Sequence, residues 1–357
     1  MKIALVGLKN AGKTTLFNAL TGQEAEVTSY TVPGNEPHIG IVPVEDEKVE
    51  ALARLYRPKK TTLATVNFVD FPGLSPGDAA SGLLSGENAD WIRNADAFAL
   101  VARNFPDDLM GEPAPLADVR LFVEELVIAD LMVVENRLER IAWGRARGRR
   151  RSAAADREER LLEKLRASLE DGKTVREAGL SYEETKTIQS FHLLSEKPLL
   201  VVLNTSEARY GKNADLMETL GASFPVVEFA GQFEMELARL GEGDDATLFM
   251  EDLGIPESAR ARLTKAAYAL LGRISFYTVG EDEVRAWTLR QGGSAVDAAG
   301  TIHSDLARGF IRAECFSTGD LFRAGSEKRI RESGLFRLEG KDYVVKPGDI
   351  LSIRFSV

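Results

Sequence analysis

The sequence is poor in the residues from which disulfide frameworks and zinc sites are built. Its 357 residues include one cysteine, Cys315, so no internal disulfide can form. The three histidines lie far apart and show no metal-ligand spacing, which argues against a zinc site. A single cysteine is typical of a reducing compartment, and we expect a cytoplasmic protein in which Cys315 is part of the core.

The sequence also lacks long apolar runs and an excess of basic residues. No uninterrupted apolar stretch approaches the roughly 20 residues that cross a bilayer, so we expect no membrane partner. The chain starts directly with an apolar segment, and we expect no targeting peptide before it. Lys and Arg number 45 against 55 Asp and Glu, a net charge of −10, which argues against a general electrostatic binder of nucleic acid. We expect no DNA specificity.

One segment departs from this acidic background. Six arginines occur between residues 140 and 151, namely Arg140, Arg145, Arg147, Arg149, Arg150 and Arg151. One interpretation is a solvated, partly frayed helix end. The other is a contact with the phosphate backbone of nucleic acid, because clustered arginines release counterions when they bind it. Both interpretations remain open.

Short apolar runs predict the buried strands of a mostly parallel sheet. The first run, Lys2–Gly7, precedes a helix that begins at Lys13. Interleaved helical patterns such as Val44–Tyr56 imply βαβ crossovers. Four further runs follow the same pattern, at residues 65–69, 97–102, 199–203 and 225–229.

Two segments outside these runs follow other patterns. Leucine, valine and isoleucine recur at coiled-coil spacing in residues 127–141 and again in 162–169, which predicts an antiparallel helical hairpin with the arginines at its tip. Two amphipathic helices packed on the sheet are the alternative. From about Ile274 short alternating strands, among them 343–345, predict a separate sheet-rich domain. The predicted limits are 1–120 and 193–273 for the domain with the mostly parallel sheet, 121–192 for the helical insertion and 274–357 for the last domain.

The segment Gly7–Thr14 matches the full phosphate-loop pattern, follows a strand and opens a helix. Glycines let successive backbone N–H groups turn towards phosphates, and the helix adds its positive N-terminal end. We expect Lys13 to contact the β and γ phosphates and the Thr14 hydroxyl to ligate Mg²⁺, so both are candidate catalytic residues. The predicted nucleotide-binding residues here are Gly7, Lys9, Asn10, Ala11, Gly12, Lys13, Thr14 and Thr15.

A second motif, Asp70-Phe71-Pro72-Gly73, directly follows the run 65–69. In a GTPase-like arrangement the aspartate reaches Mg²⁺ through water and the glycine N–H meets the γ phosphate. Asp70 is therefore a predicted metal ligand and Gly73 a predicted catalytic residue. Leu74 stands where switch-type GTPases commonly have a glutamine that orients the attacking water. Hydrolysis must then rely on another group, a bound cation or a partner.

The third motif is Asn204-Thr205-Ser206-Glu207, at the end of the run 199–203. Guanine-specific proteins carry Asn-Lys-x-Asp at this place, where the aspartate accepts from the guanine N1–H and amine. Glu207 is one methylene longer and Thr205 replaces the lysine, so guanine selectivity is expected to be poor. Adenine has the reverse polarity, which favours ATP, with GTP weaker. Asn204 and Glu207 are predicted nucleotide-binding residues.

These motifs and the tail resemble the Obg-like ATPases, the YchF family of translation-factor-class P-loop proteins. The resemblance covers nearly the whole chain. It is carried by Asn10–Leu20, Gly40–Val44, the motif at 204–207, and a diagnostic tail with stretches at 284–288, 298–300, 302–303, 309–311 and 338–345.

The resemblance implies an α/β fold with a Ras-like nucleotide domain, an inserted antiparallel coiled coil and a C-terminal β-grasp TGS domain. It also implies slow ATP hydrolysis with Mg²⁺ and association with the ribosome or structured RNA. Asn10 matches a loop asparagine that ligates K⁺ in some related proteins; a loop-stabilising hydrogen bond is the alternative. Phe229 and Ala230 match the element that packs over the base.

The chain departs from the family pattern at two places. Gly34 occupies the position of the first-switch threonine, with Thr31 the nearest replacement, and residues 103–111 contain no histidine. The leading interpretation is an ATPase switch in which Mg²⁺-ATP orders residues 30–39 and the loop after Gly73. The alternatives are a nucleotide-gated ribosome-binding protein with vestigial hydrolysis, and a GTPase.

Overall fold

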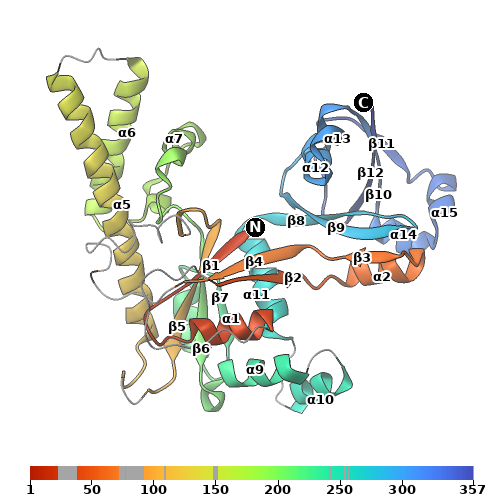
Figure 1. The fold of residues 1–357 in the computed structure, drawn as a ribbon, viewed down its shortest axis with the longest axis horizontal. Coiled ribbons are helices and arrows are strands. Elements are labelled where there is room, and N and C mark those ends of the chain that lie inside the picture. The colour runs from red at the N-terminus through yellow and green to blue at the C-terminus, as the bar shows by residue number, and fades with distance from the viewer. Residues whose placement is uncertain are drawn as a thin grey trace. The chain divides into compact units, whose positions relative to one another are not determined.

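The computed structural model describes residues 1–22, 38–71, 77, 92–107, 110–147, 152–240, 243–252, 255 and 257–356 (Figure 1). They form two compact units. The first unit consists of residues 1–41 and 67–262, and the second unit of residues 42–66 and 263–357. Within the described ranges, none of the helices has the length and hydropathy of a membrane-spanning segment.

A six-stranded sheet forms the centre of the first unit. Its strands lie in the order β2-β4-β1-β5-β6-β7, and β1 pairs in parallel with β4 and β5, as β6 does with β5 and β7. The carboxyl ends of these strands therefore meet at one edge, where such sheets bind ligands. The strands are β1 (Lys2–Val6), β2 (His38–Pro43), β4 (Thr65–Asp70), β5 (Ala97–Asn104), β6 (Leu199–Thr205) and β7 (Val226–Phe229). The strands predicted from the apolar runs are confirmed.

Helices and short 3-10 turns connect these strands. They are α1 (Lys13–Thr21), α5 (Pro115–Ala146), α6 (Ala153–Glu170), η1 (Val175–Ala178), α7 (Tyr182–Ile188), η2 (Gln189–Phe191), η3 (Glu207–Arg209), α8 (Ala214–Gly221), α9 (Gly231–Leu240), α10 (Asp244–Asp252) and α11 (Ala259–Leu270), the last of which continues into the second unit. Apolar residues of α5 pack with β1, β5 and β6 into one buried cluster, so the first turns of α5 belong to the core of this unit.

The helices α5 and α6 lie side by side and run in opposite directions (Figure 1). The apolar residues predicted to form the seam meet between them: Leu162 and Leu165 are buried in one cluster with Val134, and Leu138 and Ile141 pack against it. Ion pairs from Arg137 to Glu158 and from Arg145 to Glu159 connect the same two helices. The antiparallel helix pair is thus present, and its description as a coiled coil stays a prediction.

The second unit contains a mixed six-stranded sheet in the order β11-β10-β12-β8-β9-β3. β10 is antiparallel to β11 and β12, and β8 to β9, whereas β12 pairs in parallel with β8 and β3 with β9. The strands are β3 (Lys60–Thr62), β8 (Arg273–Thr278), β9 (Glu283–Arg290), β10 (Phe310–Ser317), β11 (Arg337–Glu339) and β12 (Asp349–Phe355). The helices are α2 (Glu47–Tyr56), α12 (Ala295–Ile302), α13 (Ser304–Arg308), α14 (Thr318–Ala324) and α15 (Glu327–Glu332).

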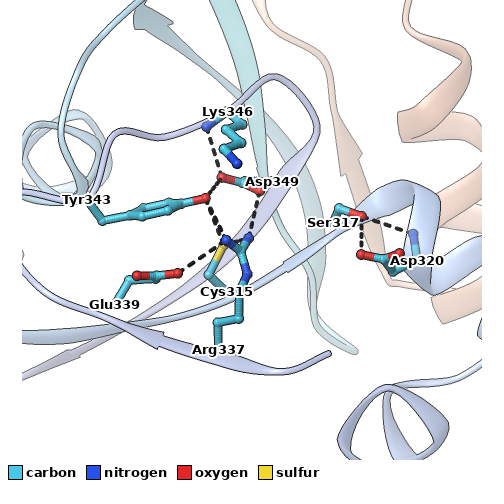
Figure 2. Close-up of polar contacts among 8 residues, drawn as sticks. All are labelled: Cys315, Ser317, Asp320, Arg337, Glu339, Tyr343, Lys346 and Asp349. Atoms are coloured by element: carbon cyan, nitrogen blue, oxygen red, sulfur yellow. Dashed lines mark hydrogen bonds and ion pairs between the residues drawn. The ribbon is translucent and has the colours of Figure 1, made fainter. Parts of the chain in front are cut away.

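The strand predicted at residues 343–345 is wrong. Residue 344 makes only an isolated bridge, and β11 lies a few residues earlier. Figure 2 shows the side-chain contacts nearby: the Tyr343 hydroxyl donates to the Asp349 carboxylate at 2.8 Å and Arg337 lies 3.3 Å from the same carboxylate. The backbone of residues 343–345 pairs with Gly293 and Ala295 instead of extending the sheet: the Ala295 N–H donates to the Tyr343 carbonyl oxygen at 2.8 Å and the Val345 N–H to that of Gly293 at 3.0 Å. Cys315, beside this cluster, is buried, and burial raises the pKa of its thiol to about 12, so it behaves as a core residue as predicted.

Within the second unit, residues 42–66 contact residues 263–357 through one strand pairing and several side chains. β3 adds to the edge of its sheet beside β9. The Tyr277 hydroxyl donates to Asp46 and the Tyr56 hydroxyl to Glu327, both at 2.7 Å. The sequence pattern predicts these residues in the nucleotide domain, and the domain limits stay a prediction.

Candidate nucleotide-binding site

The loop between β1 and α1 has a backbone that only glycine fits at two positions. Gly7 has φ 146°, and a Cβ there would lie 2.5 Å from the carbonyl oxygen of Val101 in β5. Gly12 has φ 91°, and a Cβ there would lie 2.1 Å from Nδ2 of Asn204 in β6. The loop is therefore pressed against the ends of two neighbouring strands, with the N-terminus of α1 directly behind it.

Asn204 fixes the phosphate loop to the end of β6 by a hydrogen bond. Its side chain is buried, and Nδ2 donates to the Ala11 carbonyl oxygen at 2.9 Å. The residue was predicted to bind nucleotide from its place in the base motif. In the structure its side-chain contact is with the loop backbone, which it joins to the end of β6.

Lys13 lies almost completely buried at the start of α1. Its ammonium donates to the Leu8 carbonyl oxygen at 2.9 Å, across the phosphate loop. Burial lowers the pKa of Lys13 to about 8, although the nearby Asp70 carboxylate favours the charged form. An ammonium has three N–H donors, so the group is placed to donate to an anion held by the loop.

Thr14 and Asp70 form a hydroxyl–carboxylate pair beside Lys13. The Thr14 hydroxyl donates to Asp70 Oδ2 at 2.9 Å, and His38 Nδ1 lies 3.9 Å from the same oxygen. Asp70 Oδ1 is buried and has no hydrogen-bond partner among the residues that the structure describes. Burial raises the pKa of Asp70, and the Thr14, Lys13 and His38 side chains oppose that rise.

This pair fits a magnesium ion by the chemistry of its donors. Mg²⁺ prefers oxygen ligands and is held by one or two protein groups together with substrate phosphates and water. Over the described ranges, no group of three or more His, Cys, Asp or Glu side chains could hold a metal by itself. A two-ligand site completed by a phosphate is consistent with both facts, and a cation there would compensate the unpartnered Asp70 oxygen.

The other predicted residues lie around the loop with different exposure. Lys9 and Asn10 are exposed, and Asn10 has the left-handed conformation with φ 61°. Glu207 begins the turn η3 and is exposed. Phe229 and Ala230 are buried.

The loop that starts α9 is close to the phosphate loop. A Cβ on Gly231 would lie 3.1 Å from Cγ2 of Thr15 and 3.7 Å from Oδ1 of Asn204. The predicted residues at 204, 229 and 230 and those of the phosphate loop are thus brought together, as expected from their positions after parallel strands. Gly73 and Leu74 lie outside the described residues, as do Thr31 and Gly34.

Two residues at the end of β5 were missed by sequence reasoning. Arg103 is buried and donates to backbone carbonyl oxygens of residues 105, 110, 111 and 112, which fixes the loop after the strand. Asn104 donates to the Thr205 hydroxyl at 3.1 Å and to Asn213 at 2.9 Å. The signal was present, since both are polar residues that follow an apolar strand, as Asp70 and Asn204 do.

The chemistry of this edge of the sheet defines the class of protein. Backbone N–H groups at a helix N-terminus beside a buried lysine bind phosphate groups, and the adjacent hydroxyl–carboxylate pair suits a divalent cation. The chain is a P-loop nucleotide-binding protein. The family model described as a 50S ribosome-binding GTPase matches residues 2–136. A second model, for the C-terminal part of YchF GTPases and described as a protein of unknown function (DUF933), matches residues 273–356.

The chain belongs to the YchF family, as the resemblance of its motifs indicated. It is 38% identical to the ribosome-binding ATPase YchF of Bacillus subtilis, over 99% of this chain and 98% of that protein. It is 33% identical to Obg-like ATPase 1 of Oryza sativa, over 100% of this chain and 92% of that protein. The solved structure of the Schizosaccharomyces pombe YchF GTPase matches with a TM-score of 0.81 and 28% identity, over 99% and 97% of the two chains.

Proposed function

We propose that this protein binds Mg²⁺-ATP at the phosphate loop, hydrolyses it slowly and works on the ribosome. The observation that carries the nucleotide part is the pair of Thr14 and Asp70, with its unpartnered carboxylate oxygen, beside the buried ammonium of Lys13. The ribosomal part is supported by the names of its relatives, which include the ribosome-binding ATPase YchF of Bacillus subtilis. A cytoplasmic location follows from that part of the proposal.

Each residue of the site has a definite task in this proposal. The N–H groups of the loop and the ammonium of Lys13 bind and orient the phosphates, while Thr14 and Asp70 hold the metal. The bound Mg²⁺ would supply charge neutralisation at the transferred phosphoryl group. Gly73 stays a predicted contact of the γ phosphate.

The preference for ATP rests on the base motif. Glu207 stands where guanine-specific proteins have an aspartate, and its carboxylate is exposed at the start of η3. The longer side chain displaces the acceptor pair that guanine requires. GTP is the weaker ligand in this proposal, although the Schizosaccharomyces pombe relative is named a GTPase.

A K⁺ ion is a further proposed cofactor. Asn10 is exposed at the top of the loop, and no hydrogen bond of its amide is found within the described part of the chain. Its amide oxygen is thus free to ligate a cation, which would neutralise charge on the phosphates in a site whose Leu74 cannot orient water as a glutamine does. Replacement of K⁺ by Na⁺ is expected to slow hydrolysis, and equal rates with both ions would contradict this assignment.

The first test is the affinity of the purified protein for nucleotides. Lys13→Ala should weaken ATP binding roughly ten- to a hundredfold, the loss expected for a charge-assisted hydrogen bond, and should stop hydrolysis. Lys186→Ala, at an exposed lysine of α7, is the matched control and should leave both unchanged. A tighter dissociation constant for GTP than for ATP would overturn the assignment of the base.

The second test is cosedimentation with ribosomes. Binding should differ between the ATP-analogue and ADP states, since a switch must present different surfaces in its two states. Binding without any measurable turnover in the presence of Mg²⁺, K⁺ and ribosomes would favour a nucleotide-gated binding protein over an ATPase.

We also propose that the α5–α6 pair is an inserted antiparallel coiled coil and that residues 274–357 form a β-grasp TGS domain.

A further inference from the structure

The C-terminal end of α5 carries an exposed tryptophan between two arginines. Trp143 is 65% exposed, and the guanidinium of Arg147 lies 5.2 Å from the centroid of its ring. Arg140 lies about one helical turn before Trp143 on the same side of the helix. The three side chains, with Glu139 and Gly144, line a surface depression of about 370 Å³.

The packing of the helix pair does not account for this tryptophan. The apolar seam of α5 points towards α6 through Val134, Leu138 and Ile141, and Trp143 has no part in that cluster. Tryptophan has a lower helix propensity than alanine, and its exposed ring adds apolar surface to water. Its contact with Arg147 is worth only about 0.5–1 kcal/mol at an exposed site.

The charges around Trp143 select an anionic partner. Arg137 and Arg145 are engaged by acidic residues of α6, whereas Arg140 and Arg147 have no acidic partner in the part of the chain that the structure describes. Two guanidinium groups flank the aromatic ring and one carboxylate, that of Glu139, lines the same depression, in a protein whose net charge is −10. This local reversal of charge is complementary to a phosphate backbone.

We propose that Trp143 stacks on an unpaired base of RNA while Arg140 and Arg147 bind the phosphates beside it. Proteins recognise single-stranded loops of RNA by stacking their bases on aromatic rings and arginine planes, and a duplex has no free base face to present. An acidic peptide would pair with the arginines but would leave the ring without a planar partner. The proposal rests on the proposed action at the ribosome, and it names the chemistry of one contact.

The experiment measures binding of the full-length protein to a labelled, short, single-stranded oligoadenylate by fluorescence anisotropy. Trp143→Ala should weaken binding by about 5- to 100-fold, which is the effect of losing one base stack, and Trp143→Phe should retain part of the affinity. Arg140→Gln and Arg147→Gln should each lower the slope of log K against log salt by about 0.7. Tyr182→Ala, at a 77% exposed tyrosine of α7 that is followed by two glutamates, is the control and should not change binding.

Two further arms make the proposal falsifiable. Thermal unfolding and ATP affinity of Trp143→Ala should equal those of the parent protein, so a loss of RNA binding cannot be attributed to misfolding. If Trp143→Ala weakens oligoadenylate binding no more than Tyr182→Ala, or weakens binding to an RNA duplex equally, the stacking assignment is wrong. Binding of polyglutamate that depends on Trp143, without such dependence for oligoadenylate, would show a protein partner instead.

The ribosome arm separates this proposal from the function on which it rests. If Trp143→Ala weakens both oligoadenylate binding and ribosome cosedimentation, the tryptophan is a ribosomal RNA contact. If the parent protein binds oligoadenylate through Trp143 but never cosediments with ribosomes, the ribosomal function fails and the RNA contact stands.

Discussion

The contact between the phosphate loop and Asn204 requires that residue 12 has no side chain. The φ of 91° at Gly12 and the 2.1 Å approach of Asn204 leave no room for a Cβ. Gly12→Ala should therefore displace Asn204 from the Ala11 carbonyl and lower ATP affinity about 5- to 150-fold, since a lost buried hydrogen bond costs about 1–3 kcal/mol. Isothermal titration calorimetry measures this effect.

Gly22 provides the control for that substitution. It also has a positive φ, 67°, but a Cβ there would meet no atom within 4 Å. Gly22→Ala thus carries only the backbone strain of about 1 kcal/mol and should bind ATP normally. Equal affinities of the two variants would show that the contact between Gly12 and Asn204 is unimportant.

Asp130 is a buried acid whose ionisation should be visible in the stability of the protein. Its carboxylate accepts hydrogen bonds from the backbone N–H groups of Leu194 and Ser195 and from the Ser195 hydroxyl. Burial raises the pKa of Asp130 to about 6, against these three donors. The folded protein therefore binds a proton that the unfolded chain has released between pH 4 and pH 6.

The consequence is a loss of stability with rising pH. Because the folded-state pKa is raised, the contribution of Asp130 is full below about pH 4 and is lost as the pH rises through 6, at about 1.4 kcal/mol per pH unit. Asp130→Asn cannot titrate, so the difference in unfolding free energy between parent and variant should shrink over this range in urea titrations. A difference that stays constant or grows would mean that the hydrogen bonds outweigh burial.

At the scale of elements, residues 42–66 depend on tyrosine hydroxyls for their attachment. Burial raises the pKa of Tyr56 and Tyr277, so both hydroxyls remain donors at ordinary pH, to Glu327 and Asp46 respectively. Tyr56→Phe and Tyr277→Phe should each destabilise the second unit by about 1–2 kcal/mol. Urea unfolding measures the loss, and faster hydrogen exchange in α2 locates it.

The exposed tyrosine of α7 again supplies the comparison. Tyr182→Phe removes a solvated hydroxyl and should change neither unfolding nor exchange. If Tyr56→Phe and Tyr277→Phe behave like Tyr182→Phe, the attachment of α2 rests on backbone pairing of β3 alone.

The pattern of apolar residues predicted most strands of the parallel sheet but not the short strand β11. The apolar runs located β1, β4, β5 and β6, because fully buried parallel strands read as continuous apolar segments. β11 was not predicted, because its three residues contain one exposed leucine and do not form a continuous apolar segment. Residues 343–345 have the composition of a strand, but their backbone makes only an isolated bridge with the segment around Ser294.

At the scale of the whole molecule, the chain passes from the nucleotide site into the second unit within β2 and returns within β4. β2 starts at His38 and β4 ends at Asp70, so residues 42–66 of the second unit are continuous with two strands of the site. Binding of a Mg²⁺-ATP analogue should therefore alter hydrogen exchange in α2 and β3, in addition to the phosphate loop. Thr14→Ala, which removes the hydroxyl of the metal pair, should abolish the change, whereas unaltered exchange in α2 of the parent protein would refute the connection.

The phosphate loop was determined by the sequence alone. Its strand, glycines, lysine and helix start are contiguous, so their conformations follow from local geometry. The same holds for the family, because the motifs and the tail are specific strings of residues. The motifs predicted that Thr14 and Asp70 serve one metal ion, and the tertiary structure shows their direct contact across 56 positions. Only the tertiary structure decided that Asn204 holds Ala11 across 193 positions and that residues 42–66 belong with the second unit. Such contacts depend on which strands become neighbours, and no local pattern of residues encodes that choice.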